Sequence, residues 1–237
     1  MNDIVAFIFA RGGSKGLPRK NLSNFCGKPL IAWSIEQAQS VAQIDRVIVS
    51  TDDQEIAETA RHYGAEVPFL RPAELAQDNS PEWLAWRHAL EFLKESNGVY
   101  PKVMVSIPTT SPLRSPLDIE NCIDLYLKEK PDAVITVTAA NRNPYFNMVR
   151  QDEDGFSVLV CQNKNYIFNR QQAPEVFDIT TVAYVLRSEF VLTHNTIFDG
   201  TVRQVEVPYE RAVDIDNQFD FDLAEFIYNQ GQQKAFS

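Results

Sequence analysis

Cysteine and histidine are scarce in this chain. Only three of its 237 residues are cysteines, at Cys26, Cys122 and Cys161. Their number is odd and their spacing wide, which predicts free thiols in a reducing cytoplasm and argues against a disulfide framework. The three histidines, His62, His88 and His194, follow no zinc-ligand spacing, so no zinc-type site is predicted.

Long apolar runs and an excess of positive charge are also missing. The first apolar run, from Ile4 to Ala10, has no basic residues before it and is followed by Arg11, which predicts a buried strand instead of a signal peptide. Since no run is long enough to cross a bilayer, we expect no membrane association. The formal charge of −10 disfavours binding to nucleic acid.

Strand and helix signals alternate along most of the chain. Strands are predicted at 4–10, 46–51, 67–70, 103–107 and 133–138, with helices at 30–41, 54–63, 82–93 and 117–127. This alternation indicates an α/β fold built from right-handed βαβ units around a mostly parallel sheet. Thr51 or Asp52 is predicted to cap the helix at 54–63, and Gly64 to end it.

The pattern changes between residues 141 and 177. Short β-like pieces at 146–150, 156–160 and 166–168 alternate there with polar turns. The segment is too short to bury a core of its own, so we expect a β-rich insertion within a single domain that spans residues 1–237. Strand signals return at 182–186 and 202–207, and a helix is predicted near 219–229.

A glycine-rich basic loop, ARGGSKGLPRKN (10–21), directly follows the first predicted strand. Ligands of open parallel sheets collect beyond the carboxyl ends of the strands. Gly12, Gly13 and Gly16 leave backbone amides unobstructed, as an anion-binding nest requires. Positive charge is concentrated in the same loop, at Arg11, Lys15, Arg19 and Lys20. The loop therefore predicts a phosphate site, although its spacing matches neither a Walker A loop nor a dinucleotide fingerprint; the alternative is a solvated basic turn.

A pair of carboxylates, Asp214 and Asp216, lies in the segment AVDIDN. Residues two apart in extended backbone project to the same side. Such a pair suits Mg²⁺, with water and phosphate oxygens completing the octahedron, because without a cation the two charges repel. Helix capping by these aspartates is the alternative. Asp220 and Asp222 are predicted to be first-turn charges of the last helix.

Eight segments in order resemble the acylneuraminate cytidylyltransferases, the CMP-sialic acid synthetases. They are ARGGSKGLPRKN (10–21), GKPLIAWSI (27–35), RVIVSTDDQEIAE (46–58), RPAELAQD (71–78), PTTSPLR (108–114), NPYF (143–146), RQQAPE (170–175) and VDID (213–216). The resemblance covers nearly the whole chain. It implies a Rossmann-like, three-layer α/β domain with a β-rich dimerisation arm, used as a homodimer.

The resemblance also implies an activity, Mg²⁺-dependent transfer of CMP from CTP to the anomeric hydroxyl of a sialic acid or related nonulosonate, with release of pyrophosphate. Arg11 and Lys20 would neutralise the phosphates during the reaction. The nucleotide-binding set is Arg11, Gly12, Gly13, Ser14, Lys15, Asn21, Arg71 and Ser80; the sugar-binding set is Thr110, Ser111 and Arg170, the last presented across the dimer; the metal ligands are Asp214 and Asp216. From the residues alone, Arg71 could instead close a strand, Ser80 could cap a helix, and Arg170 could be a surface arginine.

Departures from the family pattern fall on the sugar side. Pro108 replaces a glutamine, Asp178 an arginine and Thr180 an asparagine, whereas the basic loop and the aspartates are intact. We therefore expect CTP to be used, with an acceptor that this reasoning leaves open among nonulosonates such as legionaminate, pseudaminate or a deaminated sugar. The alternatives are a nucleotidyltransferase with another sugar acid or nucleotide, and an inactive nucleotide-binding relative.

Overall fold

The first strand shows how the layers form. The computed structural model describes residues 3–162 and 167–235. In β1 (Ile4–Phe9), Ile4, Ala6 and Ile8 pack into one hydrophobic cluster, whereas Val5 and Phe7 pack into another. A strand whose two faces are both buried needs helices on both sides of the sheet. The predicted three-layer α/β arrangement is confirmed.

The central sheet has six strands in the order β10-β6-β9-β5-β1-β4. Besides β1 they are β4 (Arg46–Ser50), β5 (Val103–Ser106), β6 (Ala133–Ala139), β9 (Phe177–Arg187) and β10 (Val202–Glu206). Strand β9 runs antiparallel to its neighbours β5 and β6, and the other pairings are parallel. The mostly parallel sheet is therefore confirmed, and the carboxyl ends of β5, β1 and β4 meet at one edge.

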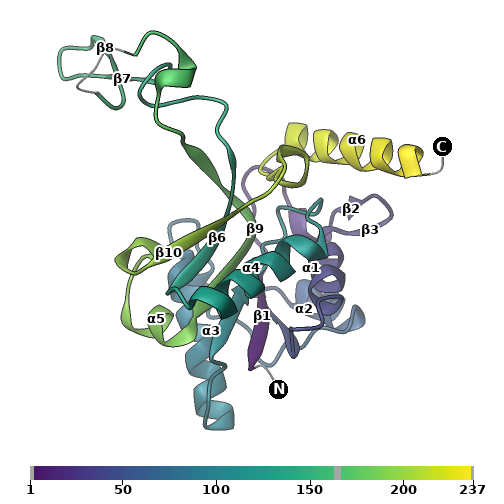
Figure 1. Ribbon diagram of the computed structural model, residues 1–237. Coiled ribbons are helices and arrows are strands. Elements are labelled where there is room, and N and C mark those ends of the chain that lie inside the picture. Colours follow the sequence, from purple (N-terminus) through teal and green to yellow (C-terminus); the bar gives the residue numbers. More distant parts are fainter. Residues whose placement is uncertain (1–2, 163–166, 236–237) are drawn as a thin grey trace.

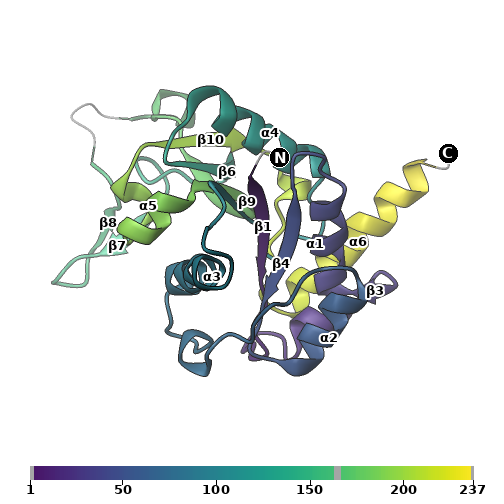
Figure 2. The same ribbon diagram turned by 90° about the horizontal axis from the view of Figure 1, so that it is seen from below.

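Helices cover both faces of the sheet, as Figure 2 shows. One face packs against α1 (Leu30–Gln39), α2 (Gln54–His62) and α4 (Pro116–Glu129), the other against α3 (Glu82–Asn97) and α5 (Ser188–Thr193). A third cluster joins α6 (Gln218–Ala235) to the hairpin of β2 (Asn24–Phe25) and β3 (Lys28–Pro29), where Phe25 meets Phe221. Within the described ranges, no helix combines the length and the apolar character that a bilayer crossing needs.

The chain between β6 and β9 leaves the sheet and carries a small hairpin of β7 (Val149–Gln151) and β8 (Ser157–Leu159). Figure 1 shows this hairpin projecting well away from the sheet. Two of the predicted β-like pieces correspond to it. The third, at 166–168, begins at a residue outside the described ranges.

Two local predictions are wrong. Residues 67–70 form no strand. The residue before them, Glu66, makes one isolated bridge to Ile48. Pro68 has no N–H with which to continue the ladder. The cap of α2 is Asp53, not Thr51 or Asp52, and its carboxylate accepts from the amides of residues 55 and 56 at 2.8 and 3.0 Å. Asp52 instead accepts from the amide of Gly12, at 2.9 Å.

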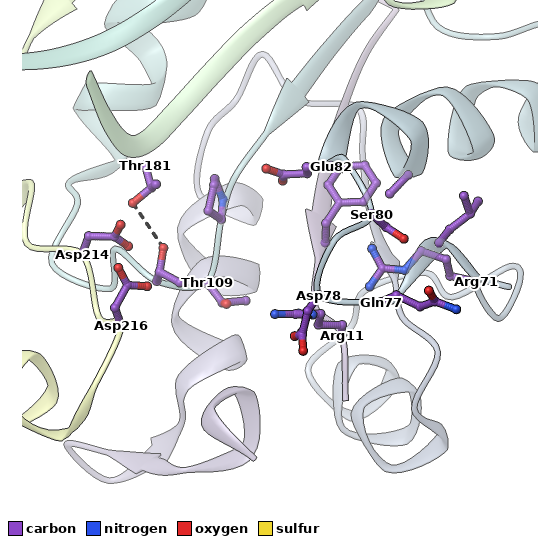
Figure 3. A pocket seen from close by; sticks show the side chains of 15 residues that line it. Arg11, Arg71, Gln77, Asp78, Ser80, Glu82, Thr109, Thr181, Asp214 and Asp216 are labelled. Carbon is purple, nitrogen blue, oxygen red and sulfur yellow. Dashed lines mark hydrogen bonds and ion pairs between the residues drawn. The ribbon is translucent and has the colours of Figure 1, made fainter. Parts of the chain in front are cut away.

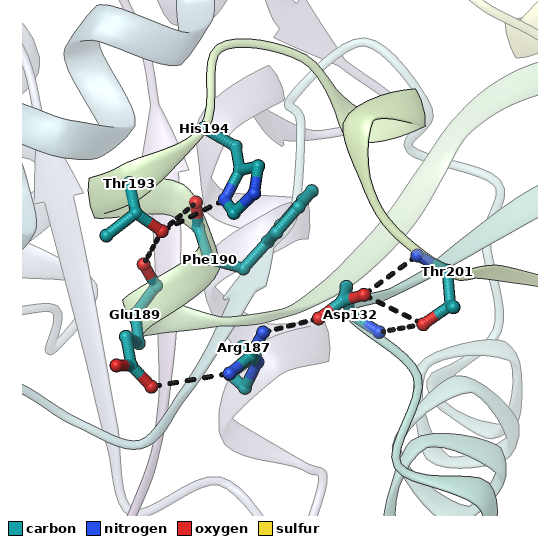
Figure 4. Close-up of polar contacts among 7 residues, drawn as sticks. All are labelled: Asp132, Arg187, Glu189, Phe190, Thr193, His194 and Thr201. Carbon is teal, nitrogen blue, oxygen red and sulfur yellow. Dashed lines mark hydrogen bonds and ion pairs between the residues drawn. The ribbon is translucent and has the colours of Figure 1, made fainter.

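A cluster of polar side chains stabilises the end of the sheet that lies opposite the carboxyl ends of the parallel strands (Figure 4). The carboxylate of Asp132, just before β6, accepts from both the amide and the hydroxyl of Thr201 at 2.8 Å and from Arg187 at 2.5 Å. These bonds, led by the Thr201 amide, lower the pKa of Asp132. The cluster joins the starts of β6 and β10 to the end of β9, so its role is structural.

We predict that Asp132→Ala lowers the free energy of unfolding by about 2 kcal/mol, since charge-assisted hydrogen bonds are lost. A carboxyl group whose folded pKa is depressed stabilises the protein above its unfolded pKa, and this contribution is lost as pH falls through the folded value. The difference in free energy of unfolding between wild type and variant, measured by urea unfolding, should therefore become smaller below about pH 4. A gap of constant size down to that range would contradict this role.

Candidate active site

A cavity of about 330 Å³ lies beyond the carboxyl ends of β5, β1 and β4. Figure 3 shows side chains from several distant segments converging on it. Six of the predicted site residues line it: Arg11, Arg71, Ser80, Thr110, Asp214 and Asp216. This edge is where ligands bind in open α/β sheets. The cationic loop and the carboxylate pair, which are about 200 residues apart in sequence, thus face one space.

Close backbone contact holds the basic loop against the aspartate segment. A Cβ added to Gly16 would lie 2.0 Å from the carbonyl oxygen of Asp216, so glycine is required there. The Lys20 ammonium donates to the carbonyl of Ile215 at 2.5 Å and lies 3.9 Å from an Asp216 carboxylate oxygen. The amide of Ile215 in turn donates to the carbonyl of Thr110 at 2.8 Å. Lys20 itself does not line the cavity.

Asn21 also acts at this junction. Its amide nitrogen donates to the carbonyl of Arg11 at 2.9 Å, and its side-chain oxygen accepts from the Thr109 hydroxyl at 2.6 Å. It is buried and does not line the cavity. In this structure Asn21 therefore positions the basic loop relative to the loop after β5.

Acidic side chains already neutralise part of the cationic loop. Asp78, at the end of the RPAELAQD segment, binds Arg11 at 2.6 Å and Lys15 at 2.7 Å, and these hydrogen bonds, led by Lys15, lower its pKa. Sequence reasoning missed Asp78, because nothing in its own segment indicates that it meets the loop. Arg19 pairs with Glu55, away from the cavity. Arg11 and Lys15 therefore converge on one carboxylate, an anionic hydrogen-bond acceptor, as phosphate recognition requires.

The middle of the loop is open. Gly13 and Lys15 are exposed, Ser14 is half-buried, and a Cβ on Gly13 would meet open space. Gly12 is closed off by comparison, since a Cβ there would lie 2.7 Å from an Asp53 carboxylate oxygen. None of Gly12, Gly13, Ser14 and Lys15 lines the cavity, although Arg11 of the same loop does.

Arg71 is buried at one end of the cavity, and its Nε and Nη2 have no hydrogen-bond partner within the described ranges. The nearest carboxylate, on Asp52, is 3.9 Å away. Burial lowers the pKa of Arg71. Donors left unpaired in a buried position are costly, so they fit a ligand with acceptor atoms. Arg71 closes no strand, because residues 67–70 form none.

Ser80 is not a helix cap. Helix α3 begins after Pro81 with no side-chain cap, and the Ser80 hydroxyl donates to the carbonyl of Glu74 at 2.6 Å. The capping alternative is therefore wrong. Ser80 closes the turn before α3 and lines the cavity beside Arg71.

The loop after β5 supplies the wall between the two ends. Pro108 lines the cavity, and its carbonyl accepts from the hydroxyl of Ser34 at 3.2 Å and from the buried Arg114. Burial lowers the pKa of Arg114 to about 9. Arg114 thus fixes the path of this loop instead of reaching the cavity.

A hydroxyl cluster of Thr110, Ser111 and Thr181 lies next to this loop. The hydroxyls of Thr110 and Ser111 lie 3.2 and 2.7 Å from that of Thr181. Ser111 is fully buried and does not line the cavity, whereas Thr110 and Thr181 do. Ser111 therefore orients Thr181.

An irregularity in β9 delivers Thr181 to the cavity. The pairing of β6 with β9 jumps from Ile135–Tyr184 to Thr136–Thr180, so the intervening residues of β9 bulge out. The Thr136 hydroxyl accepts from the amide of Ala183 at 3.1 Å and from the hydroxyl of Thr180 at 2.8 Å. These bonds give the polar groups of the bulge hydrogen-bond partners. Thr180 is thus buried within the sheet, and Thr181 faces the ligand space.

Arg170 is not brought to this cavity by its own chain. It lies on the segment between β8 and β9, where it donates to the carbonyl of Ala140 at 2.5 Å and borders a separate cavity with Asn143. Its predicted presentation from a second chain stays a prediction.

Comparison with known proteins identifies the family of this chain. A cytidylyltransferase family model matches residues 5–236. The chain belongs to the cytidylyltransferase family. It is 32% identical to post-translational flagellin modification protein B of Campylobacter coli, covering 99% of each chain. It is 34% identical to the CMP-N,N'-diacetyllegionaminic acid synthase of Campylobacter jejuni, over 96% of this chain and 95% of the relative.

Two further comparisons agree. The Campylobacter jejuni pseudaminic acid cytidylyltransferase is 30% identical over 98% of this chain and 99% of its own. Among solved structures, a CMP:2-keto-3-deoxy-manno-octonic acid synthetase complexed with CTP superimposes with a TM-score of 0.71, covering 96% of this chain and 99% of its own. At 17% identity this second likeness concerns the fold alone.

Cytidylyltransferases of this kind generally use a divalent metal ion. The carboxylate pair of this member fits one. One oxygen of Asp214 is buried without a hydrogen-bond partner in the described part of the chain. Burial, and then the charge of Asp214, raise the pKa of Asp216, and a bound cation would relieve the repulsion between the two carboxylates. The described residues hold no cluster of three or more ligating side chains, so water and phosphate oxygens would complete the shell.

We predict that Gly16→Ala lowers kcat/KM for CTP by about tenfold or more, because a misplacement of about 1 Å at Asp216 is enough for such a loss. Steady-state kinetics at varied CTP concentration measure it. The matched control is Gly231→Ala in α6, where an added Cβ meets open space and activity should be unchanged. Wild-type kinetics for Gly16→Ala would show that the loop tolerates displacement from the aspartate segment.

Proposed function

We propose that this cytidylyltransferase transfers CMP from CTP to the anomeric hydroxyl of a sialic acid or related nonulosonate and releases pyrophosphate. One observation carries the proposal: Arg11 and the Asp214–Asp216 pair line a single cavity, with Lys20 fastened beside Asp216. A nucleoside triphosphate with its metal ion needs both kinds of charge in one place. The names of the relatives, a legionaminate and a pseudaminate enzyme, support a nonulosonate acceptor.

The reaction we propose is an in-line displacement at the α-phosphorus of CTP, which depends on positioning and charge neutralisation and needs no covalent protein nucleophile. Arg11, Lys15 and the open amides of the glycine loop would hold phosphate oxygens. Arg71 would offer its unpaired N–H groups to acceptor atoms of the nucleoside, with Ser80 beside it. Mg²⁺, held by Asp214 and Asp216, would neutralise and orient the phosphates when bound.

Lys20 would act next to the metal site. Burial lowers its pKa, but the charges of Asp216 and Asp214 oppose this effect. Its ammonium group already binds the carbonyl between the two aspartates. We propose that Lys20 keeps the pair in place and contributes positive charge as the phosphates arrive.

On the sugar side we propose that Thr110 and the Ser111–Thr181 pair face the acceptor, and that Arg170 of a second chain meets its carboxylate. Residues 141–177 would serve as a dimerisation insertion within one domain. The position of Arg170 outside its own chain's cavity supports this arrangement. Exposed apolar side chains on the projecting segment, such as Val149 and Phe156, support it too, since isolated surfaces seldom expose them together.

We further propose a cytoplasmic site of action. Cys26, Cys122 and Cys161 are all free, and burial raises the pKa of the first two thiols. Unpaired thiols of this kind persist in a reducing compartment.

Pyrophosphate release tests the function. The protein is assayed with each of the four nucleoside triphosphates against N-acetylneuraminate, legionaminate, pseudaminate and 2-keto-3-deoxy-octonate, with Mg²⁺ present. We expect release with CTP and at least one nonulosonate, and its loss on chelation of the metal. Binding of CTP without release in any combination would identify an inactive relative instead.

We predict that Asp216→Ala lowers kcat by about a hundredfold or more, since a metal ligand is lost. Turnover is measured across a Mg²⁺ titration. Asp222→Ala is the matched control, because Asp222 lies on α6 outside the cavity and binds Gln218. Unchanged turnover and Mg²⁺ dependence in Asp216→Ala would remove Asp216 from the metal site.

A further inference from the structure

Glu82 has no role in the chemistry described above, yet it lines the same cavity. It is the first residue of α3, directly after Pro81. Figure 3 shows its carboxylate turned into the cavity, with Thr181 on one side and Ser80 and Arg71 on the other.

The carboxylate is poorly neutralised. Trp86 donates to it through Nε1 at 3.2 Å, and no cation among the described residues lies within ion-pair distance of it. Glu82 is exposed at the cavity, yet the protein atoms packed around its carboxyl group raise its pKa by desolvation. The hydrogen bond from Trp86, and then the charge of Arg71, oppose the effect only in part.

Its surroundings on the other side are apolar. The Trp86 ring lies 6.4 Å from Phe9 and 5.9 Å from Tyr184, centroid to centroid, and packs behind the cavity lining. Phe9 and Ala85 line the cavity next to Glu82. An acceptor oxygen thus lies beside a surface that suits a small apolar group.

Glu82 lies on α3 and faces the wall that β9 forms. Tyr184 is on the same strand as Thr181, and after burial the charges of Glu82 and Asp214 raise its pKa to about 12. The Glu82 carboxylate is turned toward the part of the cavity that Thr181 lines. This is the side of the cavity at which Thr110 and Thr181 lie, the side that we assign to the acceptor.

Charge restricts what can bind at Glu82. CTP and a sugar acid are both anions, and a carboxylate repels their phosphate and carboxylate groups. An ionised carboxylate only accepts hydrogen bonds, so its partner must be an N–H or O–H donor. An acylamino substituent offers an N–H donor together with a small apolar acyl group, and thus matches both Glu82 and the apolar lining of Phe9 and Ala85.

We propose that Glu82 selects the acceptor sugar, by accepting a hydrogen bond from an acylamino N–H group whose acyl part packs against Phe9 and Ala85. The proposal rests on the proposed function. It makes Glu82 a specificity determinant for N-acylated nonulosonates.

The test compares Glu82→Ala and Glu82→Gln with wild type, using the acylamino nonulosonate that wild type uses best and its counterpart with hydroxyl in place of the acylamino groups. Glu82→Ala should raise KM for the acylamino sugar about tenfold or more and reduce its preference over the hydroxyl sugar several-fold. KM for CTP should change less than about twofold. For Glu82→Gln, the KM for the acylamino sugar should lie between those of wild type and Glu82→Ala, because the amide keeps one acceptor oxygen.

Glu91→Gln, an exposed carboxylate on the same helix, is the matched control and should behave as wild type. Thermal unfolding checks each variant, and Glu82→Gln carries the comparison if Glu82→Ala does not fold. An unchanged sugar KM, or an equal rise in KM for CTP, would overturn the role of Glu82 while leaving the proposed function intact. Absence of turnover by wild type with every nonulosonate would overturn both.

Discussion

The contact between the glycine-rich loop and the segment 214–216 determines the site. Because Gly16 lacks a side chain, the backbone of Asp216 can lie directly against the loop, and the Lys20 ammonium then reaches the carbonyl of Ile215. The parallel strands deliver the loop after β1 to the edge of the sheet, and this contact brings the C-terminal aspartates to the same edge. Cations and carboxylates consequently face one cavity, the arrangement that a metal-bound nucleotide needs.

The same cavity holds polar groups that the protein leaves unsatisfied. Among the residues that the structure describes, Arg71 has buried N–H groups without partners, and Asp214 has a buried oxygen without one. Each costs free energy in the absence of a ligand. Groups of this kind are fixed in place before the ligand arrives, so little reorganisation accompanies binding. Asp78 and Asp52, by contrast, balance the basic loop through Arg11, Lys15 and the amide of Gly12.

Much of this could be predicted from the sequence, because the signals are local. A continuous apolar strand followed by glycines and basic residues predicted both β1 and the loop, and the resemblance placed the family. The failures concern long-range contacts. Pro68 ends a pairing that propensity favoured, and Thr181 reaches the cavity through a bulge that depends on Thr136, 45 positions earlier. Asp78 and Glu82 carry no local signal of the partners they meet after folding.

A double-mutant cycle on kcat/KM for CTP tests most directly whether the loop and the aspartates bind the same metal-bound nucleotide. The cycle combines Arg11→Ala with Asp216→Ala and compares the double variant with the two single ones. If both residues act on the same metal-bound triphosphate, their effects are coupled, and the double variant should lose at least about tenfold less than the product of the single losses. If the loss in the double variant equals the product of the two single losses to within about twofold, the two groups act independently, and this result would contradict a common site.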